Sequence, residues 1–188
     1  RGEVFWNGRR VTDPATFLIP PRVAYTPQAP RLFSESLRDN ILLGLPEDGV
    51  DLPAALRLAV FERDVQGMER GLATLVGPRG VRLSGGQVQR ASAARMFVRQ
   101  PELLVFDDLS SALDVETERQ LWEGLGSREY GIGNKENGAT TPSSVPHPHS
   151  LFPAPSSVTC LVVSHRRAAL RRADHILVLK DGRVEDEG

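Results

Sequence analysis

The chain has 188 residues and a formal net charge of −1 at pH 7, which is enough length for one domain with its own core. That charge balance provides no basic field to attract nucleic acid, and no run of about 18 apolar residues is present to span a membrane. The single cysteine, Cys160, has no partner for an internal disulfide, so the composition favours a reduced, cytosolic globular domain.

Short apolar segments predict β-strands, in chain order at residues 3–7, 22–26, 102–107, 158–163 and 176–180. Asp181 and Gly182 then predict a hairpin turn into a last short strand, "RVED". The third and fourth of these strands are continuously apolar, which is typical of a parallel sheet covered on both faces.

Helices are predicted between the strands, at about residues 52–62, 86–99 and 115–125. Asp51 and Asp114 precede the first and the last of them and are suited to cap their free N–H groups. Four apolar residues share one face of the middle helix: Val88, Ala91, Ala94 and Val98. Because strands and helices alternate, the sequence predicts an α/β layered domain with a mostly parallel sheet.

Residues 127–157 interrupt this alternation, because they are rich in glycine, serine, proline and asparagine and carry little to bury. We expect a disordered insertion that joins a helix to a strand. The predicted domain is therefore divided into residues 1–126 and residues 158–188, with the insertion between them.

Asp107 and Asp108 directly follow the apolar part of the strand at 102–107, in the stretch "LVFDDLSSALD". In open α/β sheets, ligands sit beyond the carboxyl ends of the strands, and a carboxylate held there can orient a hydrated Mg²⁺. The second carboxylate could contact an attacking water as a general base. Alternatively, both acids are solvated turn residues or helix caps, and this stretch by itself leaves the two interpretations equally open.

A second polar cluster, "LSGGQ", stands at the start of the helix predicted at 86–99. Glycines at that place let the backbone approach a ligand closely, and the free N–H groups of a helix N-terminus favour phosphate. The Ser84 hydroxyl adds one donor. Taken alone, the stretch also fits an ordinary serine cap after a glycine turn.

Together the two clusters indicate one protein family far more specifically than either does alone. "LSGGQ", followed by "LLVFDD" and then "SALD", resembles the ATP-binding cassette (ABC) ATPases, which have a P-loop NTPase-like fold with a helical signature subdomain. "YTPQ" places Gln28 just after a strand and resembles the Q-loop of that family. "LVVSH" places His165 at a strand end and resembles its switch histidine. The order and spacing match over residues 1–126 and 158–188.

The resemblance implies ATP and Mg²⁺ as cofactors and gives each matching residue a role. Asp107 would orient Mg²⁺, and Gln28 would sense the metal and the attacking water and couple to the membrane partner. Asp108 stands where the family usually carries its catalytic glutamate. His165 would contact the γ-phosphate of ATP.

The resemblance also implies partners, because the signature would bind ATP held by a second ABC ATPase domain, in a homodimer or a heterodimer. Asp114 would lie at that dimer seam. The signature residues are Ser84, Gly85, Gly86 and Gln87, of which Ser84 and Gly86 would bind the γ-phosphate. The other implied partner is a transmembrane permease domain, which would hold the chain at the cytoplasmic face of the cell membrane.

Two stretches favour the exporter type among the ABC ATPases. They are "TLVGPRG" at 74–80 and "PRLFSESLRDNILLG" at 30–44, which resemble segments of ABC exporters. No sustained heptads appear, which counts against the ABC proteins of DNA repair. The phosphate-binding loop, G-x-x-x-x-G-K-[ST], is nowhere in the chain. In the family this loop precedes the segment that matches "GEVFWNG", so we expect a chain truncated just after it and inactive by itself.

The leading hypothesis is therefore an ATPase that drives transport. Its rival is a nucleotide-binding regulatory module that dimerises without appreciable hydrolysis. Asp108 supports this alternative hypothesis, because aspartate is one methylene shorter than the glutamate that the family usually carries at this position.

Overall fold

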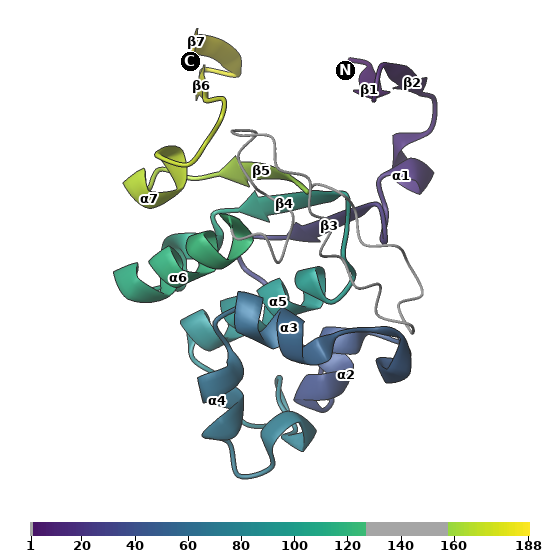
Figure 1. Cartoon of the computed structure of the whole chain (residues 1–188), viewed down its shortest axis with the longest axis vertical. Coiled ribbons are helices and arrows are strands. Elements are labelled where there is room, and N and C mark those ends of the chain that lie inside the picture. The colour runs from purple at the N-terminus through teal and green to yellow at the C-terminus, as the bar shows by residue number, and fades with distance from the viewer. Residues whose placement is uncertain (1, 127–157) are drawn as a thin grey trace, which may run out of the picture.

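The structure, a computed structural model, describes residues 2–126 and 158–188. At its centre is a three-stranded parallel sheet in the order β3–β4–β5 (Figure 1), built from Val23–Thr26, Leu103–Asp107 and Thr159–Val163. Val23 pairs with Leu103, which pairs with Thr159, so the three strands run in one direction and end at one edge. The predicted α/β class with a parallel sheet is confirmed. The insertion predicted at 127–157 lies outside the described residues.

Two antiparallel hairpins lie beyond the sheet, near the two ends of the chain (Figure 1). Their strands are β1 (Val4–Trp6) with β2 (Arg9–Val11), and β6 (Leu177–Lys180) with β7 (Arg183–Glu187). Asp181 and Gly182 have φ angles of 50° and 74°, the left-handed backbone that a tight hairpin turn requires, which confirms that prediction. Strand β2 was not predicted, although Asn7 and Gly8 carry the same turn signal, with φ angles of 49° and 76°.

Helices cover one face of the sheet and form a lobe below it in Figure 1. The α-helices are α1 (Pro14–Phe17), α2 (Leu37–Leu42), α3 (Leu52–Leu58), α4 (Glu62–Gln66), α5 (Gly85–Phe97), α6 (Val115–Gly126) and α7 (Arg167–Leu170). Short 3₁₀ turns are η1 (Glu47–Gly49), η2 (Gly71–Ala73) and η3 (Leu109–Ala112). Phe106 of β4 joins these layers, since its ring lies 6.3 Å from that of Phe97 and 5.6 Å from that of Trp122. Within residues 2–126 and 158–188, no helix is long and apolar enough to cross a membrane.

The helix predicted at 52–62 is correct at its start and wrong at its end. The Asp51 carboxylate accepts a 2.8 Å hydrogen bond from the Ala54 amide, as predicted for the cap. The helix stops at Leu58, because Val60 takes a left-handed backbone with a φ of 53°. This break turns the fully buried Phe61 into the core and lets a separate helix, α4, begin at Glu62.

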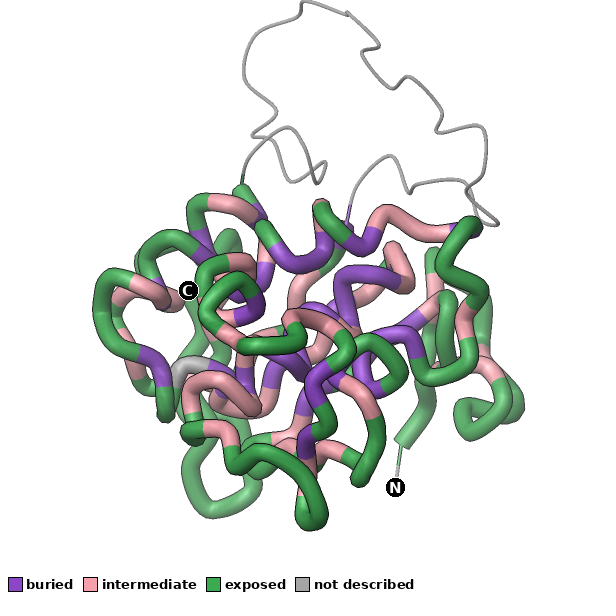
Figure 2. The backbone as a smooth tube through the Cα atoms, turned by 90° about the horizontal axis from the view of Figure 1, so that it is seen from below, coloured by how far each residue is buried: buried purple, intermediate pink, exposed green. Residues whose placement is uncertain are grey.

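Helix α5 is buried on more sides than the single apolar face predicted for it. Ala91, Ala94 and Val98 are buried as expected, whereas Val88 is only half-buried. Residues outside that face are buried as well: Gln89, Ser92, Ala93, Met96 and Phe97. The cause is the position of the helix between the sheet on one side and α2 and α3 on the other. Figure 2 shows the buried residues gathered in this interior, with exposed residues around it.

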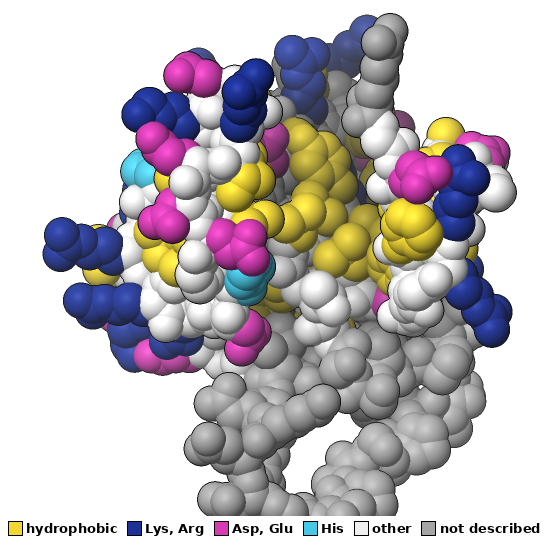
Figure 3. Space-filling model, turned by 90° about the horizontal axis from the view of Figure 1, so that it is seen from above, with side chains coloured by type: hydrophobic (Ala, Val, Ile, Leu, Met, Phe, Trp, Pro, Cys, Tyr) yellow, Lys and Arg dark blue, Asp and Glu magenta, His cyan; other side chains and the backbone are white. Residues whose placement is uncertain are grey.

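The other face of the sheet carries apolar side chains that the described residues leave exposed: Tyr25, Leu161 and Val163. Figure 3 looks onto this face and shows hydrophobic side chains gathered between the two hairpins. Among residues 2–126 and 158–188, helices cover only one of the two faces. Since parallel sheets are ordinarily buried on both faces, this surface is suited to a further covering layer.

Candidate functional site

The carboxyl ends of the three parallel strands bring the predicted site segments together. Gln28 follows β3, Asp107 and Asp108 stand at the end of β4, and His165 follows β5. Asp107 lies on the exposed face of the sheet, where its Oδ2 accepts a 3.2 Å hydrogen bond from the Tyr25 hydroxyl. Desolvation, together with this hydrogen bond and the charge of Asp107, raises the pKa of Tyr25.

Asp108 turns away from the strand with a left-handed backbone, at a φ of 51°. Its amide donates a 3.0 Å hydrogen bond to the Val163 carbonyl, which ties the end of β4 to the end of β5. The side chain is 14% exposed, and its Oδ1 has no hydrogen-bond partner among the described residues. His165 Nδ1 lies 4.0 Å from this oxygen, on a side chain that is 80% exposed. The pair therefore places a buried, unpartnered acceptor beside an exposed imidazole.

Gln28 has an exposed side chain, and its backbone is held by a residue that the sequence did not single out. The buried Gln89 of α5 donates from Nε2 to the Gln28 carbonyl at 3.3 Å and to Ser111 Oγ at 3.2 Å. Gln89 thereby links the Q-loop segment to the stretch "SALD". Its polar side chain on a buried helix is the signal by which it could have been found.

Ser84 is the N-cap of α5, and both interpretations of "LSGGQ" remain open on this geometry. Ser84 Oγ accepts a 3.2 Å hydrogen bond from the Gln87 amide, and Gln87 Oε1 accepts a 2.9 Å bond from the Ser84 amide. This reciprocal capping box leaves the exposed Ser84 hydroxyl proton for another acceptor. Gln87 Nε2 donates to Asp64 Oδ1 at 3.0 Å, so both the oxygen and the nitrogen of the Gln87 side chain are hydrogen-bonded within the chain.

The two glycines of the signature touch the stretch "SALD" of the same chain. A β-carbon on Gly86 would stand 2.9 Å from the Ala112 carbonyl oxygen, closer than real contacts allow. A β-carbon on Gly85 would stand 3.5 Å from the Ala112 β-carbon, an ordinary contact distance. Gly86 is therefore needed for close packing inside the chain, a role that the sequence did not predict.

Asp114 caps α6 as predicted. Its Oδ1 accepts a 2.9 Å hydrogen bond from the Thr117 amide, and its Oδ2 accepts a 2.7 Å bond from the Thr117 hydroxyl. These bonds stabilise the ionised form and lower the pKa of Asp114. The carboxylate is exposed at the start of the helix, next to η3.

Two ion pairs near the site were not predicted from the sequence. Arg90 forms a two-pronged pair with Asp64, with its Nε 3.0 Å from Oδ2 and its Nη2 3.1 Å from Oδ1. Arg166, next to His165, lies 3.2 Å from the buried Glu118. Their partners lie 26 and 48 residues away in the sequence, so no local pattern indicates either pair.

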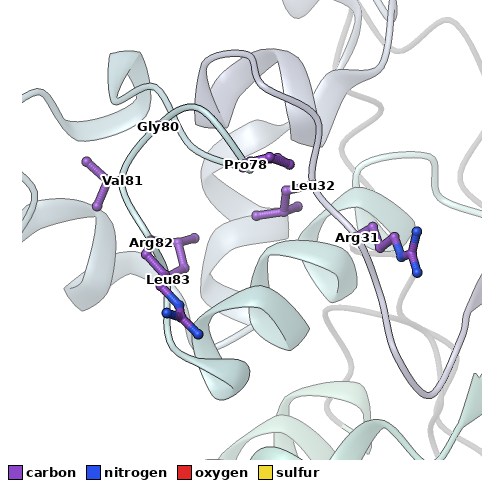
Figure 4. A pocket seen from close by; sticks show the side chains of 8 residues that line it. Arg31, Leu32, Pro78, Gly80, Val81, Arg82 and Leu83 are labelled. Carbon is purple, nitrogen blue, oxygen red and sulfur yellow. The ribbon is translucent and has the colours of Figure 1, made fainter.

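The two exporter-like segments meet beside the start of α5. The Val76 amide donates to the Glu35 carbonyl at 3.0 Å, and a β-carbon on Gly77 would stand 2.4 Å from the Phe33 carbonyl oxygen. Figure 4 shows the pocket between them, in which Leu32 points toward the loop that carries Pro78 and Arg31 points away from it. The pocket lies between Arg31–Leu32 and residues 77–83, and the paired carboxylates are not part of its lining.

The donor groups at the strand ends suit Mg²⁺ and phosphate. Within residues 2–126 and 158–188, no three His, Cys, Asp or Glu side chains cluster as a protein-only metal site. Mg²⁺ needs no such cluster, because it commonly takes one or two protein oxygens and completes its shell with phosphate and water. Asp107 and Gln28 could provide those two oxygens. The unpartnered Oδ1 of Asp108 is an acceptor of the kind that a bound water would satisfy.

Comparison with known proteins finds similarity to ABC transporter proteins. Residues 1–111 match the model of the ABC transporter family. The chain is 34% identical over 188 residues to the uncharacterized ABC transporter ATP-binding protein YwjA of Bacillus subtilis, covering all of this chain and 28% of that protein. It is 31% identical to multidrug resistance protein 1 of Entamoeba histolytica, again over the whole chain but only 13% of that protein.

A solved structure agrees with these relatives. A bacterial Atm1-family ABC exporter with ATP bound superposes with a TM-score of 0.66 at 28% identity, covering 88% of this chain and 25% of that one. The chain therefore belongs to the ABC transporter family, and its fold is that of an exporter-type ABC ATPase domain. It spans less than a third of the length of each of these relatives.

Proposed function

We propose that the chain is the greater part of an ATP-binding and ATP-hydrolysing domain that drives transport by an ABC exporter. One observation carries the proposal: Gln28, the Asp107–Asp108 pair and His165 stand at or just after the ends of three adjacent parallel strands, at the same sheet edge. Ligands of open α/β sheets bind beyond such an edge. The family match and the relatives support ATP as that ligand.

Each residue at the edge has a task in this proposal. Asp107 and Gln28 would hold Mg²⁺, which when bound neutralises negative charge on the β- and γ-phosphates. Asp108 would accept the proton of the attacking water through its unpartnered Oδ1. His165 would donate a hydrogen bond to the γ-phosphate from its exposed ring.

The domain would act as one of a pair. Ser84 would donate its free hydroxyl proton to the γ-phosphate of ATP held by a second ABC ATPase domain, and the N-terminus of α5 would favour that negative charge. Asp114 would lie at the seam. A transmembrane permease domain, fused or separate, would respond to the ATP-dependent dimerisation of the two ATPase domains at the cytoplasmic face of the cell membrane.

The test is ATP-driven dimerisation of the full-length protein. Ser84→Arg places bulk where phosphate must approach, so it should abolish the ATP–Mg²⁺-dependent shift to a dimer in light scattering. Binding of ATP to the monomer should persist, because the family holds its own nucleotide on the phosphate loop. Thr16→Arg adds the same charge at an exposed position in α1 and should leave both properties unchanged. Loss of monomer binding in Ser84→Arg would contradict a site shared between chains.

A second candidate function rests on Asp108. Aspartate reaches about 1.5 Å less far than glutamate, and a general base must come within roughly 2.6–3.2 Å of its proton donor. The Asp108 side chain is also mostly buried. We therefore propose, as the second candidate, that the chain is a regulatory module with a slow site, paired in a heterodimer with a subunit that carries glutamate. The intact "LSGGQ" of this chain would then complete the site of its partner.

A further inference from the structure

Arg166, the residue after His165, reaches across to the segment that begins at η3. Its Nη2 donates to the Ser111 carbonyl at 3.3 Å, and its Nη1 donates to the Leu113 carbonyl at 3.3 Å. The same Nη1 lies 3.2 Å from Glu118 Oε2. One planar guanidinium thus joins the loop after β5 to residues 109–114, hereafter the D-segment, and to helix α6.

Glu118 fixes Arg166 in this place. The Glu118 side chain is only 3% exposed, and its Oε1 accepts a 3.5 Å hydrogen bond from the indole Nε1 of Trp122. A buried carboxylate without a cationic partner is costly, so Arg166 cannot leave without a large penalty. The Arg166 side chain is itself only 28% exposed.

The D-segment is held from its other side as well. Ser111 Oγ accepts a 3.2 Å hydrogen bond from Gln89 Nε2, and the Ser111 carbonyl accepts from Arg166. Ser111 is therefore the point where the Q-loop segment, held through Gln89, and the histidine loop, held through Arg166, converge. Arg166 is the residue after His165 in the chain, and it is bonded to two carbonyls of the D-segment.

We infer that Arg166 is a positioning residue that couples the His165 loop to the D-segment, with the buried Glu118 as its anchor. The inference rests on the proposed function, in which His165 meets the γ-phosphate and the D-segment faces the second domain. Through Arg166, the state of this chain's nucleotide is passed to the seam. Nothing in the local sequence marks this arginine, because its partners lie 48 to 55 residues away.

The competing explanation is that Arg166 only neutralises Glu118. The double variant Arg166→Met/Glu118→Gln separates the two, because it removes both buried charges and keeps an acceptor for Trp122. If neutralisation is the whole role, the double variant behaves as wild type. If Arg166 positions the D-segment, the double variant remains defective although no charge is left uncompensated.

Two readouts are needed in the full-length protein. The first is hydrogen exchange of the peptide that spans residues 109–114, without nucleotide. We expect exchange several-fold faster in the double variant, with an unchanged melting temperature. The second is steady-state ATP hydrolysis, for which we expect kcat lower by about 10-fold or more and KM within about twofold, because misplacement of a supporting group acts on the reacting geometry. Arg167→Met, at the exposed neighbouring arginine, is the control and should match wild type in both.

Arg166→Lys keeps the positive charge beside Glu118 but loses the planar fork, so we expect it to reproduce the faster exchange with an unchanged melting temperature. Wild-type exchange and kcat in the double variant would overturn the inference. A wild-type protein that neither binds nor hydrolyses ATP would instead refute the proposed function, and the exchange comparison would still decide whether Arg166 holds the D-segment.

Discussion

Gly86 and Ala112 approach so closely that a β-carbon on the glycine would stand 2.9 Å from the alanine carbonyl oxygen. Gly86→Ala should therefore force the backbone apart and reduce the free energy of unfolding by about 1–3 kcal/mol, as overpacking usually does. Gly85→Ala is the matched control. Its β-carbon meets only the Ala112 β-carbon at 3.5 Å, and alanine favours a helix by up to about 1 kcal/mol over glycine. Urea unfolding of both variants checks the difference, and equal stabilities would contradict the close approach.

The Asp64–Arg90 pair should support the start of α5. Its side chains are 18% and 13% exposed, and Asp64 also accepts from Gln87 of the capping box. Asp64→Ala leaves a mostly buried arginine unpaired, so we expect a loss of about 2–3 kcal/mol in the free energy of unfolding.

Glu62→Ala provides the comparison for that prediction. It removes an exposed pair with Arg57 at 3.9 Å and should cost less than about 0.5 kcal/mol. Denaturant titration distinguishes the two, and a cost for Asp64→Ala as small as that for Glu62→Ala would show that the pair does not hold the signature.

Asp108 combines a short carboxylate with a left-handed backbone. Asp108→Glu in the full-length protein should raise ATP hydrolysis several-fold if the site is slow because the Asp108 carboxylate is too short to contact the attacking water. The same change should reduce stability by about 0.5–1 kcal/mol, because aspartate tolerates a φ of 51° better than glutamate. Asp108→Asn keeps that backbone preference and removes the base, so it should lower hydrolysis without loss of stability.

The outcome for Asp108 decides between the two proposed functions. A wild-type homodimer that already turns over at about 1 s⁻¹ or faster, with no gain from glutamate, would exclude the slow-site alternative. The assay should be repeated in the presence of any neighbouring transporter subunit, since the alternative assigns the fast site to a heterodimer.

Cys160 should be unreactive in the folded protein. Burial raises the pKa of its thiol to about 12 from 9.0, so almost no thiolate exists at pH 8. Iodoacetamide should label it at least about 10²-fold more slowly in buffer than in urea. Because folding raises this pKa, the neutral Cys160 thiol contributes to the free energy of unfolding below pH 9, and this contribution is lost as the pH rises from there toward 12. Equal labelling rates in buffer and urea would contradict this.

The chain of residues 1–188 should bind ATP–Mg²⁺ weakly or not at all, because it carries no G-x-x-x-x-G-K-[ST] motif to cradle the phosphates. Calorimetry on the purified chain checks this. Micromolar affinity would show that the edge residues bind nucleotide without such a loop.

The sequence predicted the features that depend on neighbours along the chain. The Asp51 and Asp114 caps and the Asp181–Gly182 turn each follow from residues within three positions. The positions of Gln28 and His165 at strand ends could also be predicted, because the end of an apolar run marks the end of a strand.

Features that depend on distant partners could not be predicted. Gln89 contacts Gln28 at a separation of 61 residues, and Arg166 contacts Ser111 at 55. The break at Val60 follows from burial of Phe61 rather than from a glycine or proline. The close approach of Gly86 to Ala112 likewise exists only once α5 and η3 are packed together. Local patterns identified the segments of the site, and tertiary contacts decide how they are held.

The register of the central sheet has a consequence for how the protein is made. Val23 of β3 pairs with Leu103, so 80 residues must be added to the chain before β3 meets its partner. At about 5–20 residues per second, the ribosome takes roughly 4–16 s over that stretch. Helices α2 and α3, which both contact α5, can form with it during this interval because all three precede β4, whereas β3 has no strand partner among the described residues until β4 is made. Chaperone binding to the nascent chain should therefore be strongest between the synthesis of β3 and that of β4.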